Sequence, residues 1–298
     1  MINIWRSLPL FIFTIFVSAC SFAMFTFPIG HFSVSGTGFL DDVISSVVVD
    51  LDATLSDSYG GSGQTLANVI AFPADSSAQT DYDFFRGLTG DASTDDPTFV
   101  GSAGDPAAHF LFDGGDIFKL VAGSNPSLFK DMHKTTGGPD FWLAVAFRYV
   151  EAGDQTLFVT AFSSNFIPQI RIKFSGTDTA EFRQVGDGSQ AIQVTHGTFT
   201  TSTDFLLIIS HKHSTNKTRF WLNTTTNTEV GQIFKTTTTD PDDTPGLFAR
   251  GNGGQPMANN TRFYGFYAGN EFLDDTKATD IIDHICTRHN RNYTGSCL

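Results

Sequence analysis

The sequence predicts an all-β protein folded as a sandwich or a barrel. Phe occurs 31 times, and Phe, Val, Ile and Thr favour the pleated, half-buried surface of a β-sheet. Clusters of Gly, Asp, Asn, Ser and Thr separate the apolar segments at intervals of about ten residues, which is typical of turns between short strands. Alternation is the third observation: in 168–176, Ile170, Ile172 and Phe174 share one face, while Arg171 and Lys173 share the other.

The predicted strands follow one another along most of the chain. Residues 43–55 form the first, and the polar, turn-rich stretch 73–108 follows it. Further strands are expected in the two halves of 109–120 and over 141–150, 155–163, 168–176, 179–186, 191–196, 204–214, 218–226 and 261–269. Strands resume after each long loop, so residues 30–298 are expected to form a single domain.

One helix is expected near the end of the sequence, over residues 273–290. Ile281, Ile282 and Ile285 lie close together on one of its faces, and Asp274 or Asp275 provides the N-cap. Cys286 and Cys297 would close a small loop after this helix if the protein resides in an oxidising compartment. The sequence has no CxxC motif, so it gives no support for a zinc or thioredoxin-type site.

The N-terminal segment 1–29 is apolar, and residues 8–29 carry no charge. This length suits a bilayer span, a secretory signal or a buried pair of strands. The stretch Val17-Ser18-Ala19-Cys20 resembles a bacterial lipobox, in which the cysteine becomes lipidated, and Met24 is an alternative start. Membrane attachment through this segment is therefore one of several interpretations left open.

The net charge of −13 and the pI of about 4.8 argue against nucleic-acid binding, because an acidic surface repels phosphate backbones. Only four of the acidic residues are Glu, and Asp is the residue that suits turns, since its short side chain bonds its own backbone. The sequence also lacks a Gly-x-Ser-x-Gly elbow, a dinucleotide-binding glycine motif and a phosphate-binding lysine loop.

The stretch FLFDGGD, residues 110–116, places Asp113 and Asp116 around a pair of glycines. In the structural interpretation, the carboxylates cap a hairpin turn and the glycines supply positive φ angles. In the alternative interpretation, Asp113, Asp116 and Asp96 are oxygen ligands of a Ca²⁺ ion. No other cofactor is expected.

Aromatic residues in a polar loop are candidates for stacking on a sugar ring. Tyr82 and Phe85, with Asp83 between them, are the predicted ligand-binding residues. Trp142 and Trp221 lie within apolar strands and are expected to belong to the core.

Four stretches carry a family resemblance: FLFDGGD, FWLAVAFRYVEAGDQTLFV, DFLLIISHKHSTNKTRFWLN and RFYGFYAGNEFLDDTKATDIIDHICTRH. In order and spacing they resemble the laminin-G-like, concanavalin A-like jelly rolls, over roughly residues 47–290. The resemblance implies a jelly-roll sandwich of two antiparallel sheets with one short C-terminal helix. The stretches DLDATLSDSYGGSGQT and FFRGLTGDASTDDPTF are similar to virion structural proteins of tailed phages, and other jelly rolls of this kind belong to bacterial envelopes.

The resemblance also bears on function. Glucanases of this fold carry Glu-x-Asp-x-Glu on one strand, and no such run occurs here, so no enzymatic activity is expected. We expect a non-catalytic extracellular or virion module, such as a phage tail or decoration protein, that recognises a glycan or cell-surface polysaccharide and contacts other virion or envelope proteins. The alternatives are a secreted or lipid-anchored glycan-active enzyme of the bacterial envelope, with Cys20 as the lipoprotein cysteine, and an architectural virion subunit without a small ligand.

Overall fold

A computed structural model gives the fold of the chain. It describes residues 38–121, 126–134, 136–151, 153–161, 169–175, 179–185, 190–195, 202–231, 240–241, 243–248 and 257–297. The apolar N-terminal segment, with Cys20 and Met24, lies outside these residues. Among the described helices, none is long and apolar enough to cross a membrane.

One sheet, which we call sheet A, has the strand order β14-β13-β12-β7-β16-β5-β4, with β1 also paired to β16. Its strands are β1 (Val47–Asp52), β4 (Thr98–Val100), β5 (His109–Leu111), β7 (Phe141–Tyr149), β12 (Thr203–Lys212), β13 (Lys217–Leu222), β14 (Thr228–Gly231) and β16 (Arg262–Gly269). The long strands β7, β12 and β16 lie at its centre, antiparallel to one another.

The other sheet, sheet B, has the order β11-β10-β9-β8-β15-β6-β3-β2. Its strands are β2 (Thr65–Leu66), β3 (Phe84–Arg86), β6 (Phe118–Leu120), β8 (Gln155–Val159), β9 (Gln169–Ser175), β10 (Thr179–Val185), β11 (Gln190–Thr195) and β15 (Gly246–Leu247). The pairs from β8 through β11 are antiparallel, as are those from β2 to β15.

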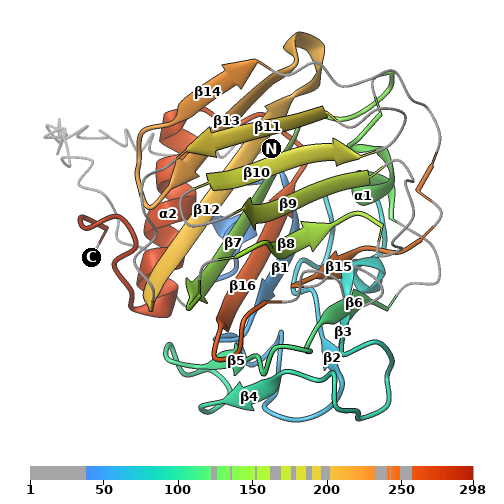
Figure 1. The fold of residues 1–298 in the computed structure, drawn as a ribbon, viewed down its shortest axis with the longest axis vertical. Helices are drawn as coiled ribbons and strands as arrows, with labels where there is room; N and C mark the ends of the chain where they lie inside the picture. The colour runs from blue at the N-terminus through green and yellow to red at the C-terminus, as the bar shows by residue number, and fades with distance from the viewer. Residues whose placement is uncertain are drawn as a thin grey trace, which may run out of the picture. The chain divides into compact units, whose positions relative to one another are not determined.

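The two sheets face each other across a core rich in phenylalanine, and α2 (Asp275–His289) packs on the face of sheet A that points away from sheet B (Figure 1). Phe147 of sheet A and Phe174 of sheet B meet in the inner layer, with ring centroids 5.3 Å apart. On the outer layer, Trp142 and Trp221 pack against Ile281 and Ile285 of the helix. The predicted sandwich of two antiparallel sheets with one C-terminal helix is therefore confirmed.

The helix begins where the sequence indicates. Asp274 is the N-cap, and its side chain accepts a hydrogen bond of 2.9 Å from the backbone N–H of Lys277. Cys286 and Cys297 form a disulfide in the structure, with their Cα atoms 6.0 Å apart.

Three local features differ from the expectation. The halves of 109–120 do not form a hairpin, because β5 belongs to sheet A and β6 to sheet B, so the corner between them crosses from one sheet to the other. The polar stretch 73–108 also contains strands β3 and β4, together with the 3₁₀ helix at Gln79–Tyr82. A five-residue helix, α1 (Ser127–Asp131), was not expected either. Elements this short carry almost no periodic signal.

Candidate functional site

The acidic corner at residues 113–116 is closed by its own side chains. The backbone N–H of Asp113 donates to Asp116 Oδ2 over 2.8 Å, and the N–H of Gly115 donates to Asp113 Oδ1 over 3.2 Å. Gly114 has a φ of 98°, a left-handed conformation that glycine adopts without a steric penalty. Both carboxylates thus cap the corner as the structural interpretation expected, but the corner is not a hairpin, and of its two glycines only Gly114 has a positive φ.

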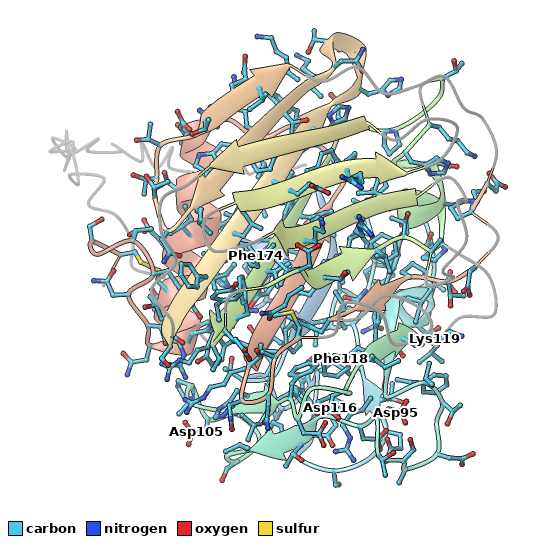
Figure 2. All side chains as sticks on the ribbon, viewed as in Figure 1. Asp95, Asp105, Asp116, Phe118, Lys119 and Phe174 are labelled. Atoms are coloured by element: carbon cyan, nitrogen blue, oxygen red, sulfur yellow. A yellow bond between two sulfur atoms is a disulfide. The ribbon has the colours of Figure 1, made fainter. Side chains whose placement is uncertain are left out.

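Asp116 lies in an unusually acidic environment. Its side chain is 2% exposed, and its Oδ1 atom has no hydrogen-bond partner among the described residues. Its pKa is raised to about 7, mainly by burial and also by the carboxylates of Asp113 and Asp95. Figure 2 shows Asp95 and Asp116 close to β3 and β6. The nearby carboxylate of Asp96 faces one cation, with its Oδ2 3.8 Å from Arg86 Nη2.

The residues predicted as calcium ligands thus come from two neighbouring loops. Asp113 and Asp116 share a corner, whereas Asp96 belongs to the loop before β4. In the part of the chain that the structure describes, no group of three or more His, Cys, Asp or Glu side chains could hold a metal ion. Calcium binding at this corner therefore stays a prediction.

Substitution of Asp116 by Asn is expected to stabilise the protein by about 2 kcal/mol at pH 8 in the presence of a chelator. The folded-state pKa of about 7 lies above the usual 3.8, so ionising Asp116 costs stability between about pH 4 and pH 7, and the full cost persists above pH 7. Asn keeps the acceptor for the Asp113 N–H and removes the charge.

Urea unfolding with EDTA at pH 8 and pH 4 measures this effect, and the gain should nearly vanish at pH 4. If calcium raises the stability of the natural chain and Asp116→Asn abolishes that response, the cation interpretation is correct instead.

The three predicted ligand-binding residues have different environments. Tyr82 is fully buried and its hydroxyl donates to Asp75, so its ring offers no face to a sugar. Asp83 accepts a 2.8 Å hydrogen bond from the backbone N–H of Asn68, and burial raises its pKa to about 6. Phe85 keeps part of its ring at the surface. A role for Phe85 and Asp83 in ligand binding stays a prediction.

A second group of polar side chains, not selected from the sequence, meets on sheet A near the C-terminal end of α2. This rim cluster consists of His109, Arg148, Asp204, Arg262, Tyr264 and Arg291. Its members come from β5, β7, β12, β16 and the segment that follows α2. Arg148 is the cross-strand neighbour of Asp204 on one side and of Arg262 on the other, so these three side chains share one face of the sheet.

Asp204 is the centre of the rim cluster. Arg148 makes a bidentate contact with it, with Nε donating to Oδ1 over 2.7 Å and Nη2 donating to Oδ2 over 2.9 Å. Arg291 Nη1 adds a bond of 3.1 Å, and the Tyr264 hydroxyl adds one of 2.7 Å. Burial alone would raise the pKa of Asp204, but the hydrogen bonds from Arg148 and Tyr264 hold it below its usual value.

The rim cluster is both fixed and accessible. The side chains of Arg148, Asp204 and Arg291 are 25%, 20% and 17% exposed. The guanidinium carbon of Arg291 lies 4.1 Å from the ring centroid of Tyr264, a cation–π contact that covers the ring. Such mutual restraint is what a preorganised binding site requires.

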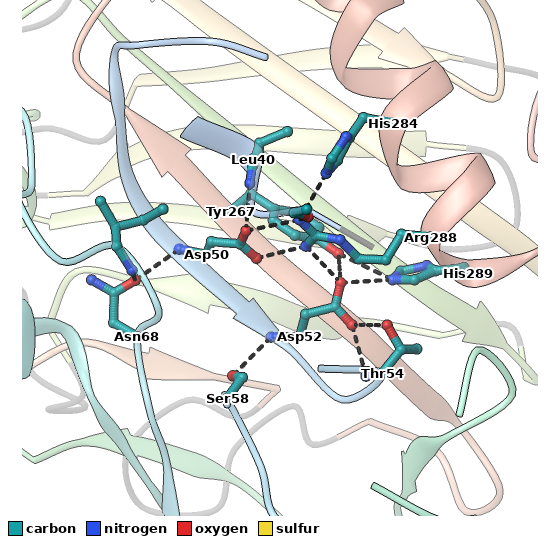
Figure 3. Close-up of polar contacts among 12 residues, drawn as sticks. Leu40, Asp50, Asp52, Thr54, Ser58, Asn68, Tyr267, His284, Arg288 and His289 are labelled. Atoms are coloured by element: carbon teal, nitrogen blue, oxygen red, sulfur yellow. Dashed lines mark hydrogen bonds and ion pairs between the residues drawn. The ribbon is translucent and has the colours of Figure 1, made fainter. Parts of the chain in front are cut away.

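A buried network fastens α2 to sheet A and so supports the rim cluster (Figure 3). Arg288 Nη1 donates to Asp50 Oδ1 over 2.8 Å and to Asp52 Oδ2 over 3.0 Å. The Tyr267 hydroxyl donates to the same Asp52 oxygen over 2.7 Å, and His289 Nε2 lies 3.0 Å from it. None of these five side chains is more than 4% exposed.

The segment after the helix is held at two points. His289 Nδ1 lies 2.8 Å from the Tyr293 hydroxyl, and the Cys286–Cys297 disulfide joins the helix to the end of the segment. Arg291 lies between the end of α2 and Tyr293, which explains how a residue outside any helix or strand keeps its place over Tyr264.

Sequence analysis missed the rim cluster because its residues are far apart along the chain. Arg148 and Arg291 are 56 and 87 positions from Asp204. One local signal was present: Arg148, Asp204 and Arg262 are charged residues at the ends of strongly apolar strands. Only the register of β12, β7 and β16 brings them into one row.

No protein-family model matches the sequence, and no curated protein matches it. Solved structures do resemble the fold. A sialidase from Trypanosoma rangeli, solved with sialic acid, is 9% identical with a TM-score of 0.52, over 81% of this chain and 33% of the sialidase chain. Domain 4 of AbnA, a GH43 extracellular arabinanase from Geobacillus stearothermophilus solved with arabinotriose, is 12% identical with a TM-score of 0.49, over 79% and 98% of the two chains.

A third resemblance is to the CBM40 of a Ruminococcus gnavus sialidase bound to α2,3 sialyllactose. It is 9% identical with a TM-score of 0.43, over 57% of this chain and 93% of the other. At these identities the likeness concerns the β-sandwich fold alone. The likeness to the Trypanosoma rangeli sialidase agrees with the jelly-roll architecture that the sequence resemblance implied.

Proposed function

We propose that this chain is a non-catalytic module that binds a glycan at the rim cluster. The observation that carries the proposal is the fixed geometry of Arg148, Asp204 and Arg291, which hold one another and still reach the surface. A few rigidly placed polar groups are what fixes a ligand's orientation. The sandwich fold shared with the Trypanosoma sialidase is compatible with such a role.

The chemistry of the cluster favours binding over catalysis. Asp204 has a lowered pKa and three donors, so it stays ionised and has no proton to give as a general acid. Arginine side chains stay protonated at neutral pH, so they cannot act as a general base. The cluster can orient a ligand, but it lacks the paired carboxylates of a glycosidase.

Part of the proposal concerns location. We place the module outside the cytoplasm, because the Cys286–Cys297 disulfide is a feature of proteins in oxidising compartments. A position on a phage particle rests on the sequence resemblance alone.

One observation favours the second candidate function, a glycan-active enzyme. Asp83 and Asp116 have pKa values raised to about 6 and about 7, and a general acid must be protonated near neutral pH. Asp116 is almost fully buried, however, which keeps it from a polymeric substrate.

A glycan array probed with the full chain tests the proposal. We expect binding to at least one glycan class, at least tenfold weaker for Arg148→Gln and unchanged for Arg219→Gln, which changes the same charge near the other end of α2. Binding that survives Arg148→Gln would remove the rim cluster as the site. Release of new reducing ends, lost in Asp83→Asn or Asp116→Asn, would favour the enzyme.

A further inference from the structure

The rim cluster holds more positive charge than its own carboxylate can balance. Arg148, Arg262 and Arg291 converge on it, and Asp204 is the acidic member. Both Arg148 and Arg291 bond to Asp204, so one negative charge is shared between two guanidinium groups. The third cation leaves the cluster with a net charge of two positive units, on a chain whose net charge is −13.

Arg262 is the residue without a counter-ion. It lies directly opposite Arg148 across the β7–β16 pair and opposite Leu111 across the β16–β5 pair, and it is half-buried. Among the described residues, no hydrogen bond or ion pair satisfies its guanidinium group. Arg291 adds a second guanidinium group, and its side chain is 17% exposed.

Two like charges placed opposite each other on a sheet are destabilising. Here the cost is increased because the cations are partly removed from water. The positive charge of the three arginines also acts on the neighbouring imidazole of His109. Its pKa is lowered mainly by burial and also by the charges of Arg262, Arg291 and Arg148. An anion held by Arg262 and Arg291 would relieve this repulsion and would accept hydrogen bonds from the unpaired guanidinium group of Arg262.

We propose that the rim cluster recognises an anionic group on the glycan, either a carboxylate or a sulfate ester, with Arg262 as its principal contact. This inference rests on the proposed function and names its ligand class. Guanidinium groups match both anions, since their parallel N–H groups donate to two oxygens at once.

The net charge of the whole chain limits further which anionic glycans are suitable ligands. A surface with a net charge of −13 repels ligands whose negative charge is dense and continuous. The cluster itself is a local cationic spot of three side chains. The ligand that fits both observations is a largely neutral polysaccharide with isolated acidic substituents, rather than a nucleic acid or a heavily sulfated chain.

Calorimetry with the full chain and four oligosaccharide probes tests the proposal. The probes are a neutral oligosaccharide that carries a single uronic acid residue, the methyl ester of that probe, the unsubstituted parent oligosaccharide and the parent with a single sulfate ester. We expect one or both anionic probes to bind at least tenfold more tightly than the neutral pair, with 0.5 M NaCl weakening the difference, and the two anionic arms separate carboxylate from sulfate. Arg262→Gln should abolish the preference, and Arg262→Lys should keep only part of it.

Arg219→Gln is the matched control, because it removes the same charge from the same face of sheet A, and its anion preference should equal that of the natural chain. Equal binding of anionic and neutral probes, or an unchanged preference in Arg262→Gln, would overturn the inference while leaving glycan binding intact. If no probe and no arrayed glycan binds, the proposed function fails as well. Arg262 has no partner to lose, and Arg262→Gln also removes its repulsion of Arg148, so we expect this variant to unfold at the same urea concentration as the natural chain or a higher one.

Discussion

Replacing Arg288 by Met is expected to lower the free energy of unfolding by about 3–5 kcal/mol, because it leaves two buried carboxylates without their shared cation. Asp50 and Asp52 are fully buried, and both accept hydrogen bonds from Arg288. Methionine fills the volume of the arginine stem, so the decrease in the free energy of unfolding reflects mainly the missing positive charge. Urea unfolding at pH 7 measures it.

A surface ion pair provides the control. Lys217, 49% exposed at its side chain, pairs with Glu229, and Lys217→Met should cost less than 1 kcal/mol. The double variant Asp52→Asn/Arg288→Met should lose less free energy of unfolding than the sum of the losses in the two single variants. The reason is that Asp52→Asn removes one of the carboxylates that Arg288→Met leaves without a cation. A loss below 1 kcal/mol for Arg288→Met would show that packing, and not this network, fastens α2 to the sheet.

The sequence predicted the long strands and the C-terminal helix because their signals are local. Ile170, Ile172 and Phe174 alternate within seven residues, and Asp274 stands directly before the helix that it caps. The sheet to which each strand belongs is not a local property. The corner at 113–116 has the composition of a hairpin turn and still joins different sheets, since pairing is decided by strands distant in the sequence.

The candidate site was harder to predict than the fold. Tyr82 was chosen because its neighbours are polar, yet a single 3₁₀ turn places its ring in the core. His289 is buried against Asp52, a contact that no local pattern in the sequence indicates. The rim cluster depends on strand register and on the disulfide-bound segment after α2, and neither leaves a motif in the sequence.

His284 is expected to make the fold acid-sensitive, with a loss of about 3 kcal/mol at pH 4 from this residue alone. Its Nε2 atom lies 2.8 Å from Arg288 Nη2, and a guanidinium group only donates, so the imidazole must accept and stay neutral. Its pKa is lowered to about 4, mainly by burial and then by the charge of Arg288, while the backbone at Gly38 and the carboxylates of Asp52 and Asp42 act more weakly in the opposite direction.

The direction of the pH dependence follows from the pKa values of His284 in the unfolded and the folded chain. The unfolded chain protonates His284 near its usual pKa of 6.5, whereas the folded chain resists protonation down to about pH 4. The contribution is therefore complete above pH 6.5 and is lost as the pH falls from 6.5 to 4. Asp116 acts in the opposite sense over part of this range, so the diagnostic quantity is the difference between the natural chain and a variant.

His284→Gln keeps an acceptor for Arg288 and cannot titrate, which makes it the variant to compare. Urea unfolding at pH 7, 6, 5 and 4 should show the natural chain losing about 3 kcal/mol relative to His284→Gln over this interval. Parallel stability curves for the two proteins would contradict the prediction. An NMR titration of the imidazole gives a second reading of the same property: a ring that protonates near pH 6.5 in the folded protein would mean that Arg288 does not face it in solution.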